Sequence, residues 1–395
     1  MDFSNVKYIR IPEGYATKVI LDDTIVWEES APMLASSNTW YKGTPAHNTY
    51  TSIEITRDYT PTNSEDETWN ADSENAGTIK AYRSGTNLIL AITNGARFIY
   101  ANPNSSLAFG GNSSATRWSH VTSFTGLELL NTSKVTTMER MFDGLFLLEN
   151  IDVSHFDTSL VTNMDMVFNN CEELKEIDVS KWDTSNVTDM YAMFADCTQI
   201  TKLDISRWDV RKVSNANSLV YDCFKLKDID LSSADWCGVT NFGMSFYCCY
   251  ELENISLKRS GKAHSESAVV LQAVVSDCTK LKSFDSANFS TQGATDLSYF
   301  FEGCSTLEEV RLTNWDFSTS TSHYSMFAAC NKLKRVDLHG VVQSIKAAPR
   351  NIFPYNTSQK IEVYVGSEEE KNFVQNNLAL NATNLIFYIG DMPFK

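Results

Sequence analysis

Apolar residues recur along the second half of the chain with a period of 26 residues. The segment from Leu174, LKEIDVSKWDTSNVTDMYAMFADC, is followed from Ile200 by ITKLDISRWDVRKVSNANSLVYDC, with apolar residues at matching places. A cysteine closes most of these segments and marks one register, which contains Cys171, Cys197, Cys223, Cys249, Cys278, Cys304 and Cys330. A fixed period of this length predicts a solenoid, in which each unit forms one coil and neighbouring coils bury each other's apolar faces.

Each coil is expected to contain two short elements. In the LxxIDVS part, apolar residues alternate with polar ones, which predicts a strand with Ile177 and Val179 facing inward and Asp178 facing solvent. In the VTDMYAMFADC part, apolar residues are three and four positions apart, which predicts a short helix or helical turn. Two further inward rows are expected, one of Val135, Val161, Val187, Val213, Val239, Ala294 and Ser320, the other of Phe142, Phe168, Phe194, Val220, Phe246, Phe301 and Phe327.

The pattern divides the chain into four segments. Residues 1–30 contain the β-favouring runs VKYIRIP, ATKVIL and TIVWE and predict a small β module. Residues 31–120 begin with a polar linker and continue with short strands, which suit a β-rich N-terminal cap. Residues 121–340 hold about eight repeats. Residues 341–395 predict a strand, a helix with Ser367 as its N-cap, and a second strand, which together suit a C-terminal cap.

Composition narrows the classes of partner. The chain has 395 residues, 43% of them hydrophobic, and a formal net charge of −16, which disfavours nucleic acid and anionic membranes as partners. No apolar run is long enough to cross a bilayer, so membrane insertion is not expected. The segment MDFSNVKYIRIPEG lacks the apolar core of a secretion signal; if Met1 is the native start, export by that route is not expected. The register cysteines are expected to be free and buried rather than disulfide-bonded or metal-binding.

Three groups of side chains are candidates for binding. The first is an acidic row at one strand position of successive coils, which comprises Asp152, Asp178, Asp204 and Asp230 and continues after gaps with Asp285 and Asp337. The row could form a surface for cations. We favour the alternative, in which the carboxylates pair with Lys181, Lys202 or Arg207 or accept hydrogen bonds from turn hydroxyls and backbone amides. Three tyrosines could stack on sugar rings or anchor a protein partner, namely Tyr221, Tyr247 and Tyr250. A three-residue insertion carries a basic cluster that could form a recognition loop, namely Lys258, Arg259, Lys262 and His264.

Catalytic signatures are missing from the sequence. The six histidines are scattered, and no HExxH, Walker loop, GxGxxG or GxSxG motif occurs. His323 takes the place of an inward methionine and is interpreted as a core histidine whose ring nitrogens have hydrogen-bond partners. No catalytic residue, metal or cofactor is therefore expected.

The repeated phrase LxxIDVSxWDTSxVTNMxxMFxxC resembles the repeat of BspA-like leucine-rich-repeat proteins of bacteria. The preceding segment, with EDETWNAD and GTIKAYRSGTNLILAIT, is similar to the β region before the repeats in that family. The resemblance implies a right-handed, leucine-rich-repeat-like α/β solenoid without enzymatic activity and a role in adhesion. The N-terminal stretch VKYIRIPEGYATKVILDDTIVWEE resembles, more weakly, the short β modules of phage tail and virion proteins.

These resemblances, together with the many carboxylates of the chain, leave three hypotheses. In the first, the protein is a virion component that attaches to other virion proteins through residues 1–30 and recognises a bacterial surface glycan or protein. In the second, it is a BspA-like adhesin of the bacterial cell surface. In the third, it is a carbohydrate-active enzyme. A homo-oligomer would suit an appendage, although no coiled-coil heptads indicate one.

Overall fold

The computed structural model describes the backbone and, for most of the chain, the side chains. The described residues are 6–8, 18–21, 24–28, 32–35, 49–57, 59–61, 67–74, 76–111, 118–231, 234–260, 268–341, 350–354 and 359–393. For residues 6–8, 18–21, 24–28 and 230 the backbone alone is described.

Two sheets precede the repeats. Strands β1 (Val6–Tyr8), β2 (Lys18–Leu21) and β3 (Thr24–Glu28) form an antiparallel sheet on the β-favouring runs of the sequence. A five-stranded sheet follows in the order β5-β6-β7-β4-β9, which joins β5 (Glu67–Asn70), β6 (Ile79–Ser84), β7 (Asn87–Ile92), β4 (Ser52–Thr56) and β9 (Ser123–Thr125). Beside it, β8 (Ile99–Tyr100) pairs in parallel with β10 (Leu130–Asn131), which follows the 3-10 helix η2 (Leu127–Leu129).

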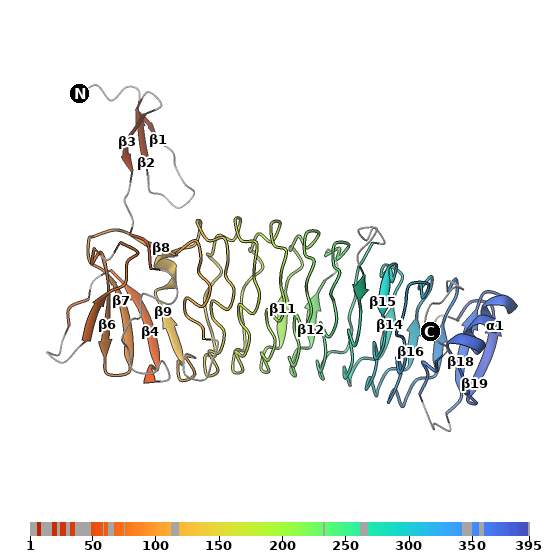
Figure 1. Ribbon diagram of the computed structural model, residues 1–395. Helices are drawn as coiled ribbons and strands as arrows, with labels where there is room; N and C mark the ends of the chain where they lie inside the picture. Colours follow the sequence, from red (N-terminus) through yellow and green to blue (C-terminus); the bar gives the residue numbers. More distant parts are fainter. Residues whose placement is uncertain are drawn as a thin grey trace.

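The repeats then stack as successive coils (Figure 1). Parallel bridges join equivalent residues of neighbouring coils, as in the series Thr137, Asn163, Asp189, Asn215 and Asn241. On the strand side, short parallel strands form where the pairing is regular: β11 (Lys202–Asp204) with β12 (Asp228–Asp230), and β14 (Ser283–Asp285) with β16 (Glu309–Arg311) and β17 (Arg335–Asp337). After the insertion, β13 (Val269–Val270) pairs with β15 (Ala294–Asp296).

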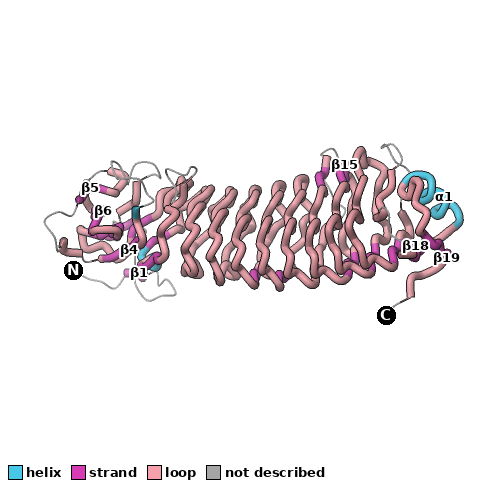
Figure 2. Tube along the Cα trace, turned by 90° about the horizontal axis from the view of Figure 1, so that it is seen from below, coloured by secondary structure: helices cyan, strands magenta, loops and turns pink. Residues whose placement is uncertain are grey.

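The second part of each coil, the turn side, is not a helix, so this prediction was wrong. Alternate backbone N–H groups, those of Met190, Ala192 and Phe194, donate to carbonyls of the next coil at 2.9 Å instead of bonding within a helix. Ala192 and Asp196 have φ of 48° and 61°, in the left-handed region that interrupts an α-helix. The expected α/β solenoid is therefore a stack of strands and turns (Figure 2), with one α-helix, α1 (Glu368–Asn377), in the described part of the chain.

Three inward rows fill the interior, as predicted. Every residue of the predicted valine and phenylalanine rows is buried. The rings of Phe142, Phe168 and Phe194 lie nearly parallel, with centroids 5.4 and 5.6 Å apart. The register cysteines are buried and free, which confirms the prediction. Their thiols also donate to backbone carbonyls of the preceding coil, as from Cys197 Sγ to the Phe168 oxygen at 3.2 Å.

The chain ends in a strand, a helix and a strand. β18 (Ile361–Val365) pairs in parallel with β17, and β19 (Leu385–Ile389) pairs in parallel with β18, so both extend the sheet of the coils. Ser367 caps α1 as predicted, because its side chain accepts a hydrogen bond from the Glu370 N–H at 3.1 Å.

Candidate functional site

Four aromatic rings gather on the turn side of two neighbouring coils. Tyr221 and Tyr247 precede the register cysteine by two positions, and Phe224 and Tyr250 directly follow it. The ring centroids of Tyr221 and Tyr247 are 5.1 Å apart with an interplanar angle of 12°, and those of Phe224 and Tyr250 are 5.0 Å apart at 15°. Tyr250 is exposed and the other three rings are half-buried. We name these four residues the aromatic platform.

Backbone hydrogen bonds hold the platform in register. The carbonyls of Tyr221 and Tyr247 each accept an N–H from the preceding coil, and the carbonyls of Ala195 and Ser276 do the same on the two flanking coils. Ala195 and Ser276 therefore occupy the equivalent position on either side of the tyrosine pair. Because both are small and buried, no large side chain of this row covers the outward faces of the pair.

Polar groups border the platform. Asp222, Cys248 and Asp277 lie at the left-handed position before the register cysteine, with φ of 56°, 57° and 58°. Burial raises the pKa of Asp222. Burial, together with the nearby Cys248 and Asp277, raises the pKa of Tyr247. A hydrogen bond with Cys248 raises the pKa of Tyr250 to about 12. The phenols therefore remain protonated at neutral pH and present hydroxyls beside carboxyl groups.

The sequence identified most of the platform. It selected Tyr221, Tyr247 and Tyr250, and the structure brings all three together. It missed Phe224, which stacks on Tyr250. The signal was available, because Phe224 and Tyr250 both stand one position after the register cysteine.

The acidic row on the strand side is held by neighbouring serines. Asp178 Oδ1 accepts hydrogen bonds from the Ser180 N–H at 3.1 Å and the Ser180 hydroxyl at 2.7 Å. Asp152 with Ser154, and Asp204 with Ser206, repeat this arrangement. These hydrogen bonds lower the pKa of all three carboxyl groups. The structure therefore supports the favoured interpretation for these residues, in which turn hydroxyls and backbone satisfy the row. The side chain of Asp230 lies outside the described part.

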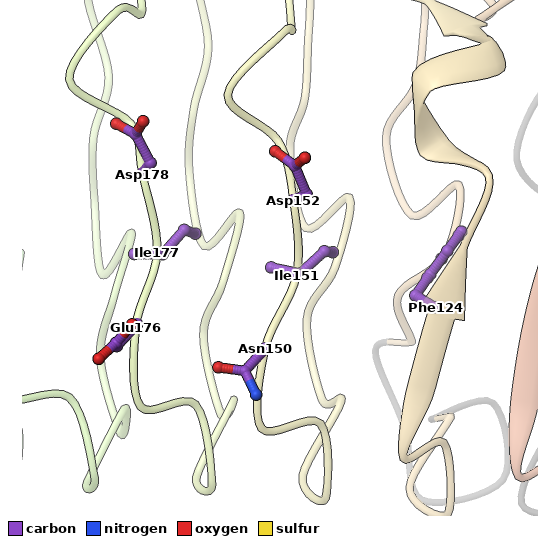
Figure 3. Close-up of a pocket in the computed structure, with 7 residues that line it drawn as sticks. All are labelled: Phe124, Asn150, Ile151, Asp152, Glu176, Ile177 and Asp178. Carbon is purple, nitrogen blue, oxygen red and sulfur yellow. The ribbon is translucent and has the colours of Figure 1, made fainter.

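A shallow groove of about 510 Å³ lies where the row meets the N-terminal sheet. It is lined by Phe124, Asn150, Ile151, Asp152, Glu176, Ile177 and Asp178. Figure 3 shows Ile151 and Ile177 pointing to the same side, toward Phe124, with the aspartates further along the strands. On the strand side, β9 pairs with β4, whereas pairing between coils begins at Asn150. No bridge joins β9 to Asn150 in the described part, and the groove lies between them.

Beyond the insertion the strand side changes character. Asp285 pairs in register with Arg311, and Arg311 with Asp337, so an arginine separates the two aspartates. On the adjacent row, Arg335 forms an ion pair with Glu309. Asp285 and Asp337 thus share one strand position, as predicted for a row that continues after gaps, and Arg311 occupies the gap between them.

The structure describes two members of the basic cluster of the insertion, Lys258 and Arg259, and only Arg259 is buried. Arg259 is fully buried, and its Nη1 donates to the carbonyls of Ser290 at 2.6 Å and Gln292 at 3.3 Å on the next coil. Burial lowers the pKa of this guanidinium. The prediction that Arg259 belongs to a recognition loop was wrong, because its donors satisfy carbonyls of the adjacent coil. Lys258 is half-exposed and lies 3.9 Å from Asp235. Lys262 and His264 lie outside the described residues.

The described side chains give little basis for metal chemistry or membrane spanning. No three His, Cys, Asp or Glu side chains among them are grouped so as to hold a metal ion. No helix in the same part of the chain is long and apolar enough to cross a membrane. His323 is buried as predicted, and neither of its ring nitrogens has a hydrogen-bond partner in the part that the structure describes.

The chain belongs to the family described as "Mycoplasma protein of unknown function, DUF285", whose model matches residues 113–236 and 269–358, more than half of the chain. Residues 189–284 also match the "BspA type Leucine rich repeat region (6 copies)". These repeats are therefore those of a BspA-like leucine-rich-repeat protein. None of the curated protein sequences matches the chain. The similarity of residues 1–30 to virion modules finds no support in these comparisons.

Two solved structures are similar over nearly their whole length. A leucine-rich repeat protein from Bacteroides ovatus is 14% identical, over 98% of this chain and 99% of that chain, with a TM-score of 0.35. The pneumococcal vaccine antigen PcpA is 13% identical, over 98% of each chain, with a TM-score of 0.34. The fold assignment rests on the coil geometry and the family matches rather than on these scores.

Proposed function

We propose that the protein is a non-enzymatic recognition protein and that the aromatic platform is its contact site. The observation that carries the proposal is the parallel stacking of two aromatic pairs on adjacent coils, bordered by Asp222 and Asp277. The BspA-type repeats support it, because such coils give a long rigid surface on which side chains vary while the interior repeats.

A surface glycan is the ligand that this chemistry favours. Aromatic faces carry partial negative charge and attract the C–H groups of a pyranose ring, while phenols and carboxylates bond sugar hydroxyls. The outward faces of the Tyr221–Tyr247 pair meet only small residues of their own row, so a ring could stack there. A protein ligand is the alternative, since exposed tyrosines also anchor protein partners.

The finer architecture also belongs to the proposal. We take the coils as a right-handed solenoid of about eight repeats, closed at both ends. At one end, the backbone N–H groups of Leu107 and Phe109 donate to carbonyls of the first coil at 2.8 and 2.9 Å. At the other, β18 and β19 extend the sheet. Both arrangements support capping, because an uncapped stack exposes unpaired backbone groups.

Two locations suit a recognition protein of this kind. The BspA-type repeats favour the bacterial cell surface. The three-stranded sheet β1–β3 and its resemblance to virion modules favour attachment to a phage particle. Mass spectrometry of purified particles and of surface-shaved cells separates the two, because the protein should be found in one fraction and missing from the other.

Binding to intact cells tests the proposal. The full chain, fluorescently labelled, is incubated with a panel of bacterial and host cells, with and without enzymatic removal of surface polysaccharide. We expect selective binding that falls when the polysaccharide is removed. Selective binding that survives this removal would assign a protein ligand. Absence of binding to every cell type would contradict a recognition role.

A further inference from the structure

The sheet of the coils ends in an unpaired edge at β19. This strand pairs with β18 on one side and is the last strand of its sheet, so in the described part its other edge pairs with nothing. It has five residues, whereas the strands of the coils have two or three. A long open edge offers a row of backbone N–H and C=O groups to another strand.

Apolar side chains are exposed around this edge. Four of the eight large hydrophobic side chains that are exposed in the described part lie within ten residues of one another: Leu380, Ile386, Tyr388 and Ile389, at 41%, 39%, 43% and 51% exposure. Tyr388 stacks on Tyr364 of β18, with centroids 5.2 Å apart. Proteins usually protect such an edge with charges or proline. Here the segment from Asn372 to Gly390 contains no Asp, Glu, Lys, Arg or Pro.

We propose that β19 is an interface with a second copy of this chain, formed by antiparallel pairing of the two β19 edges across a two-fold axis. With Phe387 at the centre, Ile386 of one copy faces Tyr388 of the other. An aromatic residue opposite a β-branched one is a favourable cross-strand pair. The same strand therefore supplies both halves of a self-complementary, closed interface.

Charge explains why a second copy fits this surface. Each chain carries a formal charge of −16, so two copies repel over most of their surface. The uncharged segment around β19 lets the two backbones approach with little of this repulsion. Because the remaining repulsion is screened by salt, the dimer should strengthen as ionic strength rises.

Analytical ultracentrifugation of the full chain over a range of concentrations tests the inference. The wild type should dimerise, and more tightly at higher salt. Ile386→Lys and Ile389→Lys each place like charges near the centre of the interface and should weaken dimerisation at least about 100-fold. Leu160→Lys is the matched control, since Leu160 is as exposed as Ile389, at 51%, but lies on one of the first coils, at the opposite end of the stack from β19. It should leave dimerisation unchanged.

Three results would overturn the inference. One is a wild-type chain that stays monomeric up to about 1 mM. Another is a dimer that both lysine variants leave unchanged, which would place the interface elsewhere. The third is equal weakening by Leu160→Lys. Thermal melts of each variant show whether it is folded, and Ile386→Ser, which removes the apolar contact without adding charge, should weaken the dimer to a smaller extent.

Discussion

Before the insertion, Asp152, Asp178 and Asp204 are each satisfied by a serine two residues later, whereas beyond it Arg311 stands between Asp285 and Asp337. The two halves of the strand side thus solve the same problem of repeated charge in different ways. In the first half the solution lies within one coil. In the second, Asp285 and Asp337 also accept a backbone N–H from two residues later, but Arg311 on the coil between them separates the two negative charges.

This difference separates charged side chains that stabilise the stack of coils from charged side chains that are available to bind a ligand. A carboxylate held by its own serine can change without disturbing its neighbours, and in the first half it also lines the groove beside Phe124. A carboxylate paired across coils, as Glu309 is with Arg335, stabilises the sheet and is less available to a ligand. The coils before the insertion, which also carry the aromatic platform on their turn side, are therefore the better candidates for binding.

The largest effect is expected from substitutions in the buried phenylalanine row, which both halves share. Phe194→Ala in the first half and Phe301→Ala in the second each leave a cavity in the stacked phenylalanine row, at a cost of about 3–5 kcal/mol in the free energy of unfolding. Urea unfolding followed by circular dichroism measures both. An unchanged unfolding curve for either variant would show that the inward row is not continuous.

The next effect sharpens the contrast between the halves. Arg335→Met removes the ion pair with Glu309 and places an apolar side chain between Glu309 and Glu362, which flank this position on β16 and β18, at a cost of about 2–3 kcal/mol. Lys181→Met, in the first half, is the control and should change stability by less than about 0.5 kcal/mol, because Lys181 is exposed. Equal effects from the two substitutions would remove the distinction.

A third test uses pH. Burial lowers the pKa of His323, so the folded state binds fewer protons there than the unfolded state, and stability falls as the pH decreases below about 6.5. His323→Met restores the residue that Met164 and Met190 supply at this register. Melting temperatures between about pH 7 and pH 5 should therefore fall less steeply in the variant. Parallel curves for the two proteins would show that His323 does not titrate on unfolding.

The smallest effect tests the serine-held row directly. Asp178→Asn keeps an oxygen that can accept both hydrogen bonds from Ser180, so stability should change by less than about 0.5 kcal/mol. Asp285→Asn keeps the acceptor of the Ala287 N–H but removes the negative charge next to Arg311 in the register of the sheet, and should cost about 0.5–1 kcal/mol. Paired thermal melts at low salt measure the difference, and a larger loss for Asp178→Asn would reverse our assignment.

The interior of the stack was predictable because its residues recur at a fixed period and have the same partners in every coil. The conformation of the turn side was not predictable. Its apolar residues are three and four positions apart, as in a helix, although residues with left-handed backbone interrupt it. A cue was present: Asn170, Asp196, Asp222 and Gly303 stand just before the register cysteine, and these residue types tolerate the left-handed region. Arg259 could not be placed, because its burial depends on carbonyls of the next coil, at Ser290 and Gln292.

The measurement that tests the account most directly compares tyrosine variants in binding to polysaccharide from recognised cells. Isothermal titration of the full chain should show at least about a tenfold loss of affinity for the Tyr221→Ala, Tyr247→Ala double variant. Tyr324→Ala is the control, since Tyr324 is as exposed as Tyr250 but pairs edge-to-face with Tyr299. It should bind like the wild type. Full affinity in the double variant would contradict the assignment of the aromatic platform as the binding site.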